Sequence, residues 1–185
     1  MIQKPRKTLF VATRGVKEYR ATIPLWVTEQ DVVLEIGCEW GTTSALLAAH
    51  CQEVIATDIS ADCIARARTR HPELHFEVLD GFDVLAALRL GKPFTKVYID
   101  MSGISGYRSP LDAISLLMMY ATVLRPEAII IKSASVQSFA GQCIAWKHPS
   151  PPCLTEEACI HEREGLGSDR GGVGLGLSLG SPEVT

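Results

Sequence analysis

Acidic residues and glycines recur along this chain at the ends of short apolar runs. Glu35 and Gly37 end the run "VVLEIG", Asp58 ends "EVIATD", and Asp80 and Asp100 end "HFEVLD" and "KVYID". Parallel strands bring their carboxyl ends to one edge of a sheet, so carboxylates at successive strand ends would gather around one ligand. Taken singly, each acid is as readily a helix N-cap or a loop residue. Together they favour a nucleoside-binding site.

The loop between Gly37 and Gly41 bears on which nucleoside fits. Its glycines let the backbone turn sharply, and a helix beginning near Thr42 would present unpaired N–H groups. Asp58 follows at about the interval at which a carboxylate meets ribose hydroxyls in nucleotide-binding βαβ units. A dinucleotide site would have glycine where Glu39 stands, because a carboxylate there repels a pyrophosphate. The loop therefore disfavours NAD(P) and favours a nucleoside without phosphates, such as S-adenosylmethionine.

The elements that must position these residues alternate regularly from Asp31 onward. Length and β-branched composition predict strands at Val32–Gly37, Glu53–Asp58, His75–Asp80, Lys96–Asp100 and Ala128–Ser133. Apolar residues at helical spacing predict helices at Thr42–Cys51, Ala61–Arg70, Phe82–Leu90 and Pro110–Leu124. Strict alternation implies right-handed crossovers and a mostly parallel sheet. We therefore predict a Rossmann-like, doubly wound α/β fold.

These motifs resemble those of class I S-adenosylmethionine-dependent methyltransferases over Val32–Ser133. The stretches "LEIGCEWG", "ATDIS", "VLDGFDV" and "VYIDMSG" are similar to the first four motifs of that family. The resemblance implies methyltransferase activity with S-adenosylmethionine as cofactor and no metal. It also implies a cofactor site made of Glu35, Gly37, Gly41, Thr42, Asp58, Ile59, Asp80 and Gly81.

The resemblance further assigns roles to three of the strand-end acids. It implies that Asp58 binds the ribose hydroxyls, that Asp80 meets the adenine amino group, and that Asp100 lies beside the transferring methyl group. The departure is Glu39, which stands where many members have glycine and leaves the shape of the loop open. Trp40 has two equal interpretations, as a side chain at the mouth of the site or as an ordinary hydrophobic plug.

Lys132 closes the apolar run "AIIIKS" on the strand expected beside Asp100. The motifs "GTT" and "IIIKS", with Asp at the end of the fourth strand, are similar to fibrillarin-like RNA 2'-O-methyltransferases. That similarity implies that Asp100 and Lys132 orient and deprotonate a ribose hydroxyl, with RNA as the acceptor. A lysine that merely extends from a strand end into solvent is the alternative.

Other substrate candidates lie before and after the strands. Lys17, or Arg20, would supply a basic group from the N-terminal side. Tyr107 and Arg108 lie in the loop "SGISGYRSP", which either contacts the acceptor or simply connects a strand to a helix. Arg66 and Arg70 share one helix face, for which a solvated surface is a commoner explanation than phosphate contact.

Composition divides the chain into three segments. Residues 1–20 carry six basic side chains against Glu18, and residues 1–30 are expected to form a solvated basic arm, with phosphate contact or organelle targeting as alternatives. Residues 31–146 would form the cofactor-binding domain. Residues 147–185, rich in Gly and Pro, are expected to be mostly disordered.

The remaining expectations concern location and chemistry in general. No apolar stretch reaches the roughly 18 residues of a membrane span, so we expect an intracellular protein, most simply a cytoplasmic one. The six cysteines form no CxxC pair and indicate reduced thiols rather than a zinc site. A net charge of −3 gives no general attraction to nucleic acid. The oligomeric state is left open.

A competing hypothesis comes from the end of the predicted sheet. Members of the family usually add about two strands after the fifth, whereas nothing after Ser133 supplies them convincingly. The segment Val136–Trp146 can form one helix, after which the pattern ends. A sheet that lacked its last strands would expose the edge of its fifth strand. The chain would then be an inactive S-adenosylmethionine-binding or interaction module.

Overall fold

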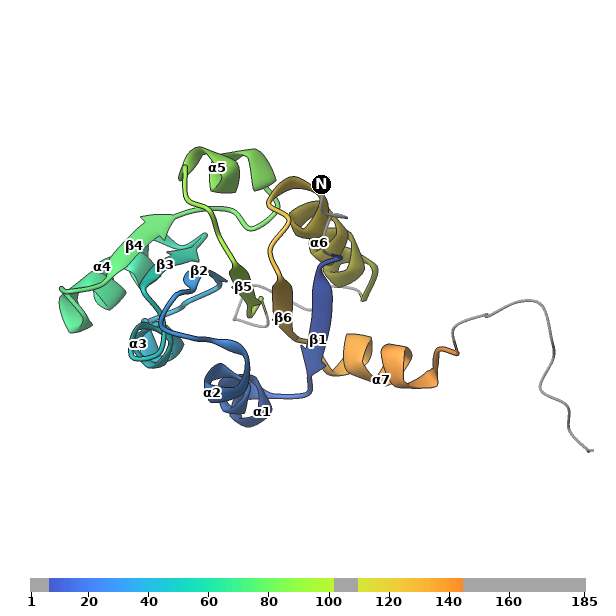
Figure 1. Ribbon diagram of the computed structural model, residues 1–185. Coiled ribbons are helices and arrows are strands. Elements are labelled where there is room, and N and C mark those ends of the chain that lie inside the picture. Colours follow the sequence, from blue (N-terminus) through green and yellow to red (C-terminus); the bar gives the residue numbers. More distant parts are fainter. Residues whose placement is uncertain (1–6, 102–109, 145–185) are drawn as a thin grey trace, which may run out of the picture. The chain divides into compact units, whose positions relative to one another are not determined.

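A computed structural model of the chain describes residues 7–101 and 110–144. Within them, six strands form one sheet in the order β1-β6-β5-β2-β3-β4, and each neighbouring pair is parallel (Figure 1). The strands are β1 (Leu9–Thr13), β2 (Val32–Ile36), β3 (Glu53–Asp58), β4 (His75–Val78), β5 (Lys96–Ile99) and β6 (Ala128–Lys132). The predicted doubly wound α/β fold is confirmed, and the five predicted strands are present within a residue or two of their expected ends.

Seven helices are assigned in the same residues. They are α1 (Val16–Ala21), α2 (Ile23–Trp26), α3 (Thr42–Ala48), α4 (Ala61–Arg70), α5 (Val84–Arg89), α6 (Pro110–Val123) and α7 (Ala134–Gln142). Side-chain caps fix where three of them begin. Ser60, Asp83 and Ser133 each accept a hydrogen bond from the backbone N–H three residues later. Such caps satisfy N–H groups that have no partner inside the helix.

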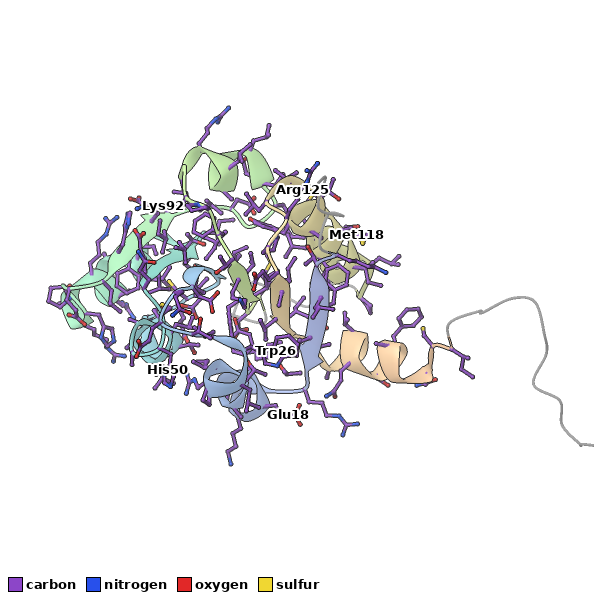
Figure 2. All side chains as sticks on the ribbon, viewed as in Figure 1. Glu18, Trp26, His50, Lys92, Met118 and Arg125 are labelled. Carbon is purple, nitrogen blue, oxygen red and sulfur yellow. The ribbon has the colours of Figure 1, made fainter. Side chains whose placement is uncertain are left out.

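Helices cover both faces of the sheet (Figure 1). On one face, Val33 and Tyr98 pack with Tyr19 of α1 and Leu47 of α3, and Trp26 of α2, labelled in Figure 2, packs against this cluster. The opposite face packs against α5, α6 and α7 through a second set of buried residues: Leu34, Ile36, Val97, Ile99, Ile131, Ala87, Leu116, Tyr120 and Val136. A sheet covered on both faces needs strands that are apolar throughout, which explains the uninterrupted apolar runs in the sequence.

The N-terminal segment belongs to this domain, so the expected solvated arm over residues 1–30 is wrong for its described part, residues 7–30. Tyr19 is fully buried, and Val27 is nearly so. Lys7, Arg14 and Lys17 are exposed, whereas apolar residues of the same segment enter the core. The prediction failed because it was based on the net charge of the segment and did not consider the apolar residues on the other side of its short helices.

The edge of β6 is also covered, contrary to the expected exposed edge. β1 pairs with β6 in parallel, from Leu9 opposite Ala128 to Thr13 opposite Lys132. A strand from the N-terminal side therefore occupies the edge that was expected to lack its C-terminal strands. Among the described residues no strand follows β6, and residues 145–185 lie outside them. The exposed edge, which was one consequence expected of an incomplete sheet, is therefore not found.

Several predictions fall outside the described residues. Tyr107 and Arg108 lie there, as does the whole of the segment 147–185. The helix expected over Val136–Trp146 corresponds to α7, which begins and ends earlier. None of the helices in the described ranges is long and apolar enough to cross a membrane.

Candidate active site at the carboxyl edge of the sheet

β2 lies in the middle of the sheet, between β5 and β3. The chain continues from β2 to β3 and β4 on one side, and then crosses back to β5 and β6 on the other side. A ligand site in an open parallel sheet forms at such a point, beyond the carboxyl ends of the strands. The strand-end residues singled out from the sequence lie along this edge, on β2, β3 and β5 or in the loops that follow these strands and β4. The edge is therefore where the candidate site is built.

The loop after β2 is held in a conformation that favours glycine. Gly37 and Gly41 have φ values of 82° and 80°, and Glu39 between them has a φ of 51°. A Cβ on Gly37 would lie 1.8 Å from the carbonyl oxygen of Asp100, so only glycine lets this loop touch the end of β5. Glu39 thus adopts the left-handed backbone conformation of the glycine that it replaces, at a cost of about 1–2 kcal/mol. The sequence left the shape of this loop open, and the structure shows that the backbone of Glu39 has a positive φ, as glycine readily does.

Asp58 ties the loop after β2 to the loop after β3. Its Oδ2 accepts a hydrogen bond from the Glu39 N–H (2.9 Å), and its Oδ1 accepts one from the Ser60 N–H (2.9 Å). A carboxylate can accept about four hydrogen bonds, so acceptor positions remain for a ligand. Ile59, which follows Asp58 in the sequence, is 56% exposed and offers an apolar surface beside the carboxylate.

Asp80 and Gly81 form the next part of the edge, after β4. Asp80 is exposed, and its Oδ1 accepts a hydrogen bond from the Phe82 N–H (3.0 Å). Gly81 is buried against β2, where a Cβ would lie 2.7 Å from the Ile36 side chain. The missing side chain lets the loop after β4 approach β2 closely.

Asp100 and Lys132 form an ion pair across the ends of β5 and β6. The Lys132 Nζ lies 2.5 Å from the Asp100 Oδ2, and the two side chains are 19% and 18% exposed. The Asp100 N–H donates to the Ile36 carbonyl (2.8 Å), which fixes the acid at the end of β2 as well. The two candidate catalytic residues are therefore in contact, partly accessible and rigidly mounted.

Glu35 is the buried acid of the site. It is 1% exposed, and its Oε2 accepts a hydrogen bond of 2.5 Å from the Ser44 hydroxyl of α3. Burial raises the pKa of Glu35 to about 7, since the Ser44 hydrogen bond only partly offsets the loss of water and the Asp100 charge adds to the rise. Glu35 is thus a group that changes charge near neutral pH inside the candidate site.

The N-terminal helix α1 brings Tyr19 and Arg20 to the same edge. Arg20 was predicted only as an alternative to Lys17, and Tyr19 was not predicted. The Arg20 Nε donates to the Thr43 hydroxyl (3.0 Å) at the start of α3. The Tyr19 hydroxyl is buried without a hydrogen-bond partner among the described residues. Burial raises the pKa of Tyr19 well above its ordinary value, and the charges of Glu35 and Asp100 raise it further.

Lys17, predicted as a substrate contact, is exposed on α1 and makes no described contact with the Asp100–Lys132 pair. The sequence named Arg20 as its alternative, and the structure places Arg20, not Lys17, beside α3. Tyr19 was missed altogether. The apolar spacing of Tyr19 and Ile23 could have indicated a helix with a buried face. Thr42 begins α3 next to Gly41, as expected.

The described residues contain no group of three or more His, Cys, Asp or Glu side chains that could hold a metal ion. Four cysteines fall in these residues, Cys38, Cys51, Cys63 and Cys143, and all four are free thiols.

A family model described as a methyltransferase domain matches residues 33–127, slightly more than half of the chain. The chain belongs to the methyltransferase domain family. The match begins in β2 and ends at the residue before β6, and so includes every strand-end acid of the site. No curated protein sequence matches the chain.

Solved structures agree with this fold. The methyltransferase is similar to an rRNA methylase from Streptococcus thermophilus (12% identity, TM-score 0.51, 84% of this chain and 93% of that chain). It is also similar to a Streptococcus mutans protein described as a methyltransferase in complex with SAH (9% identity, TM-score 0.53, 84% and 94%). A dimethyladenosine transferase from Plasmodium falciparum matches at 18% identity and a TM-score of 0.50, with 71% of this chain covered.

The chain spans less than half the length of several structures that it matches, 46% for the Plasmodium falciparum transferase. At identities this low the similarity establishes the class I methyltransferase fold and not the acceptor.

Proposed function

We propose that this chain is an S-adenosylmethionine-dependent methyltransferase that methylates a ribose hydroxyl of RNA. The observation that carries the proposal is the Asp100–Lys132 ion pair of 2.5 Å at the carboxyl edge of the sheet. Membership of the methyltransferase domain family supports the class of reaction. The pair itself supports a hydroxyl acceptor, because a hydroxyl must lose a proton during transfer and a lysine can receive it.

The residues along the edge fit S-adenosylmethionine. Asp58 keeps acceptor positions for two ribose hydroxyls, and the exposed Ile59 beside it offers a surface for the adenine ring. The carboxyl groups of Glu35 and Asp100 suit the positively charged ammonium and sulfonium groups of the cofactor. Glu39 disfavours a pyrophosphate, so the loop fits a cofactor without phosphates. The cofactor, when bound, supplies a methyl group on a positively charged sulfur.

Asp100 would position Lys132, and Lys132 would act on the acceptor hydroxyl. Asp100 holds the Lys132 Nζ in place and is itself held by the Ile36 carbonyl. Lys132 must first give up to solvent the proton that it carries in its ion pair with Asp100. The neutral Lys132 amine would then take the proton of the acceptor hydroxyl as the hydroxyl oxygen receives the methyl group that the cofactor supplies. Positioning and proton removal are what such a displacement requires of the protein.

RNA as acceptor is supported by the motifs that the sequence shares with fibrillarin-like RNA 2'-O-methyltransferases. In those enzymes, Asp and Lys residues in these two places serve a ribose hydroxyl. One of the similar structures is an rRNA methylase, which is compatible with an RNA acceptor.

The test is transfer of a tritiated methyl group to RNA, protein and small-molecule fractions by the full chain. Lys132→Ala and Asp100→Ala should each lower transfer to RNA about 10²–10⁴-fold, the usual contribution of a general base, and Lys132→Ala should retain cofactor binding. Lys92→Ala is the matched control, because Lys92 also pairs with a carboxylate (Glu53, 2.8 Å), but at the residue where β3 begins rather than at a carboxyl end of a strand.

Two results would contradict the proposal in different ways. Transfer to protein or small molecules alone would overturn RNA as the acceptor. Transfer to RNA that Lys132→Ala leaves unchanged would overturn the role of the ion pair.

A further inference from the structure

A second surface lies beside the cofactor loop, where Trp40 packs over helix α4. The Trp40 ring forms one wall of a shallow cavity of about 360 Å³, and Ala65, Arg66, Thr69 and Arg70 form the rest. The guanidinium carbons of Arg66 and Arg70 lie 5.8 Å and 5.0 Å from the centre of the ring. Trp40 is half-buried, whereas both arginines are exposed. We refer to these five residues as the Trp40 surface.

The two arginines of this surface lack an acidic partner. Among the residues that the structure describes, no carboxylate forms an ion pair with Arg66 or Arg70. Arg68, on the other side of α4, shows the contrast, since its guanidinium donates to the Phe76 carbonyl and lies 3.7 Å from the Glu77 carboxylate. Two positive charges held against one indole repel each other, and a bound anion relieves that repulsion.

Arginine beside an aromatic ring is a combination suited to nucleic acid. Guanidinium groups bind phosphate in a two-pronged geometry, and they are the side chains most often used for it. Aromatic rings and guanidinium planes stack on unpaired bases of a single strand, whereas the bases of a duplex are not available for stacking. A cavity of this size lies within the range of small-ligand sites and has room for one nucleotide.

We propose that the Trp40 surface binds single-stranded RNA, with a backbone phosphate on Arg66 and Arg70 and a base against Trp40. The choice of RNA rather than single-stranded DNA rests on the proposed function. The geometry links the two sites, because Trp40 follows Glu39, whose N–H is bound by Asp58 of the cofactor site. A strand bound here would lie beside the loop that Asp58 anchors.

The experiment measures binding of a fluorescein-labelled single-stranded RNA of about 12 nucleotides to the full chain by anisotropy, without cofactor, over a range of salt concentrations. The double variant Arg66→Gln and Arg70→Gln should bind roughly 10–100-fold more weakly, with a salt dependence reduced by about 1.4 in slope for two lost phosphate contacts. Trp40→Ala should weaken binding by a similar factor, and Trp40→Phe, which keeps a ring, should weaken it less.

The matched control is the double variant Arg68→Gln and Arg89→Gln, which removes the same net charge from exposed positions elsewhere. It should change the affinity less than twofold. Thermal unfolding of every variant confirms that it is folded, which is expected because the replaced arginines are exposed. Equal weakening by the control pair, or no weakening by the Arg66/Arg70 pair, would overturn the proposal.

Binding of other ligands shows whether single-stranded RNA is the preferred ligand of the Trp40 surface. Inorganic phosphate, duplex RNA and phosphatidylserine vesicles are tested in the same way, and tighter binding of duplex or vesicles than of the single strand would also overturn the proposal. The proposed function can fail separately. RNA bound through Arg66 and Arg70 but never methylated would contradict the function alone. Methylation with a KM for RNA unchanged in the double variant would contradict this surface alone.

Discussion

The two edges of the sheet each contain a lysine–aspartate ion pair, and the surroundings of the pairs differ. At the amino edge, the Lys96 Nζ lies 2.7 Å from the Asp31 Oδ1, and the two side chains are only 8% and 6% exposed. At the carboxyl edge, the pair of Lys132 and Asp100 is about three times as accessible. The same two residue types thus form an internal pair at one edge and a reachable pair at the other.

Hydrogen bonding separates the two pairs further. Asp31 also accepts hydrogen bonds from the Thr28 N–H and the Thr95 hydroxyl, and Lys96 also pairs with Glu127 (3.0 Å). Burial alone would raise the pKa of Asp31, but the hydrogen bonds from Lys96, Thr95 and Thr28 outweigh it and hold the pKa below its ordinary value. A group so fully partnered is a structural one. The accessible pair is the better candidate for chemistry on a substrate.

The largest expected difference between the edges is in stability. Lys96→Met leaves the Asp31 carboxylate buried without its cation and should lower the free energy of unfolding by about 3–5 kcal/mol. Lys132→Met should lower it by only about 1 kcal/mol, since water reaches Asp100. Urea denaturation measures both, with the exposed pair variant Lys92→Met as control. Equal losses at Lys96 and Lys132 would show that both pairs are structural.

The second difference is in pH dependence, carried by Asp31 and Glu35 at the two ends of β2. The pKa of Glu35 is raised from 4.5 to about 7, so its contribution to stability is full below pH 4.5 and is lost as the pH rises to about 7, by roughly 3 kcal/mol. The pKa of Asp31 is lowered, so its contribution is present above about pH 4 and is lost as the pH falls further.

Glu35→Gln tests this difference, because it removes the titrating group and keeps the shape. Between pH 4.5 and 7 the free energy of unfolding should fall less in the variant than in the unchanged chain, and at pH 8 the variant should be the more stable. Denaturation at a series of pH values measures it. An unchanged slope in Glu35→Gln would mean that Glu35 has an ordinary pKa in the folded protein.

The smallest expected effect concerns backbone strain. Glu39 in the cofactor loop and Arg125 before β6 have nearly equal φ values of 51° and 52°. Replacing either by glycine relieves about 1–2 kcal/mol of strain but costs about 0.5–1 kcal/mol in unfolded-state entropy, so each variant should be more stable by up to about 1.5 kcal/mol. Only Glu39→Gly should also change cofactor affinity, as measured by calorimetry. An equal change of cofactor affinity in Arg125→Gly would show that the effect does not come from the loop after β2.

Much of the carboxyl edge could be predicted because its signals are local. Asp58, Asp80 and Asp100 end apolar runs, and each end is readable from a few neighbouring residues. The Asp100–Lys132 contact followed from the parallel order of strands. Arg20 and Tyr19 are different, since their places beside α3 and the strand ends depend on how α1 packs onto the sheet.

The amino acid sequence by itself determined the alternation of strands and helices, the class of fold and the acids that line its edge, because hydrophobic periodicity and strand-end composition are local properties. The tertiary structure alone decided that Leu9–Thr13 closes the edge beside β6, a pairing between segments 119 residues apart in register. It also decided which lysine–aspartate pair is internal and which arginines face Trp40. These outcomes depend on packing between distant segments, for which a short stretch of sequence carries no periodic signal.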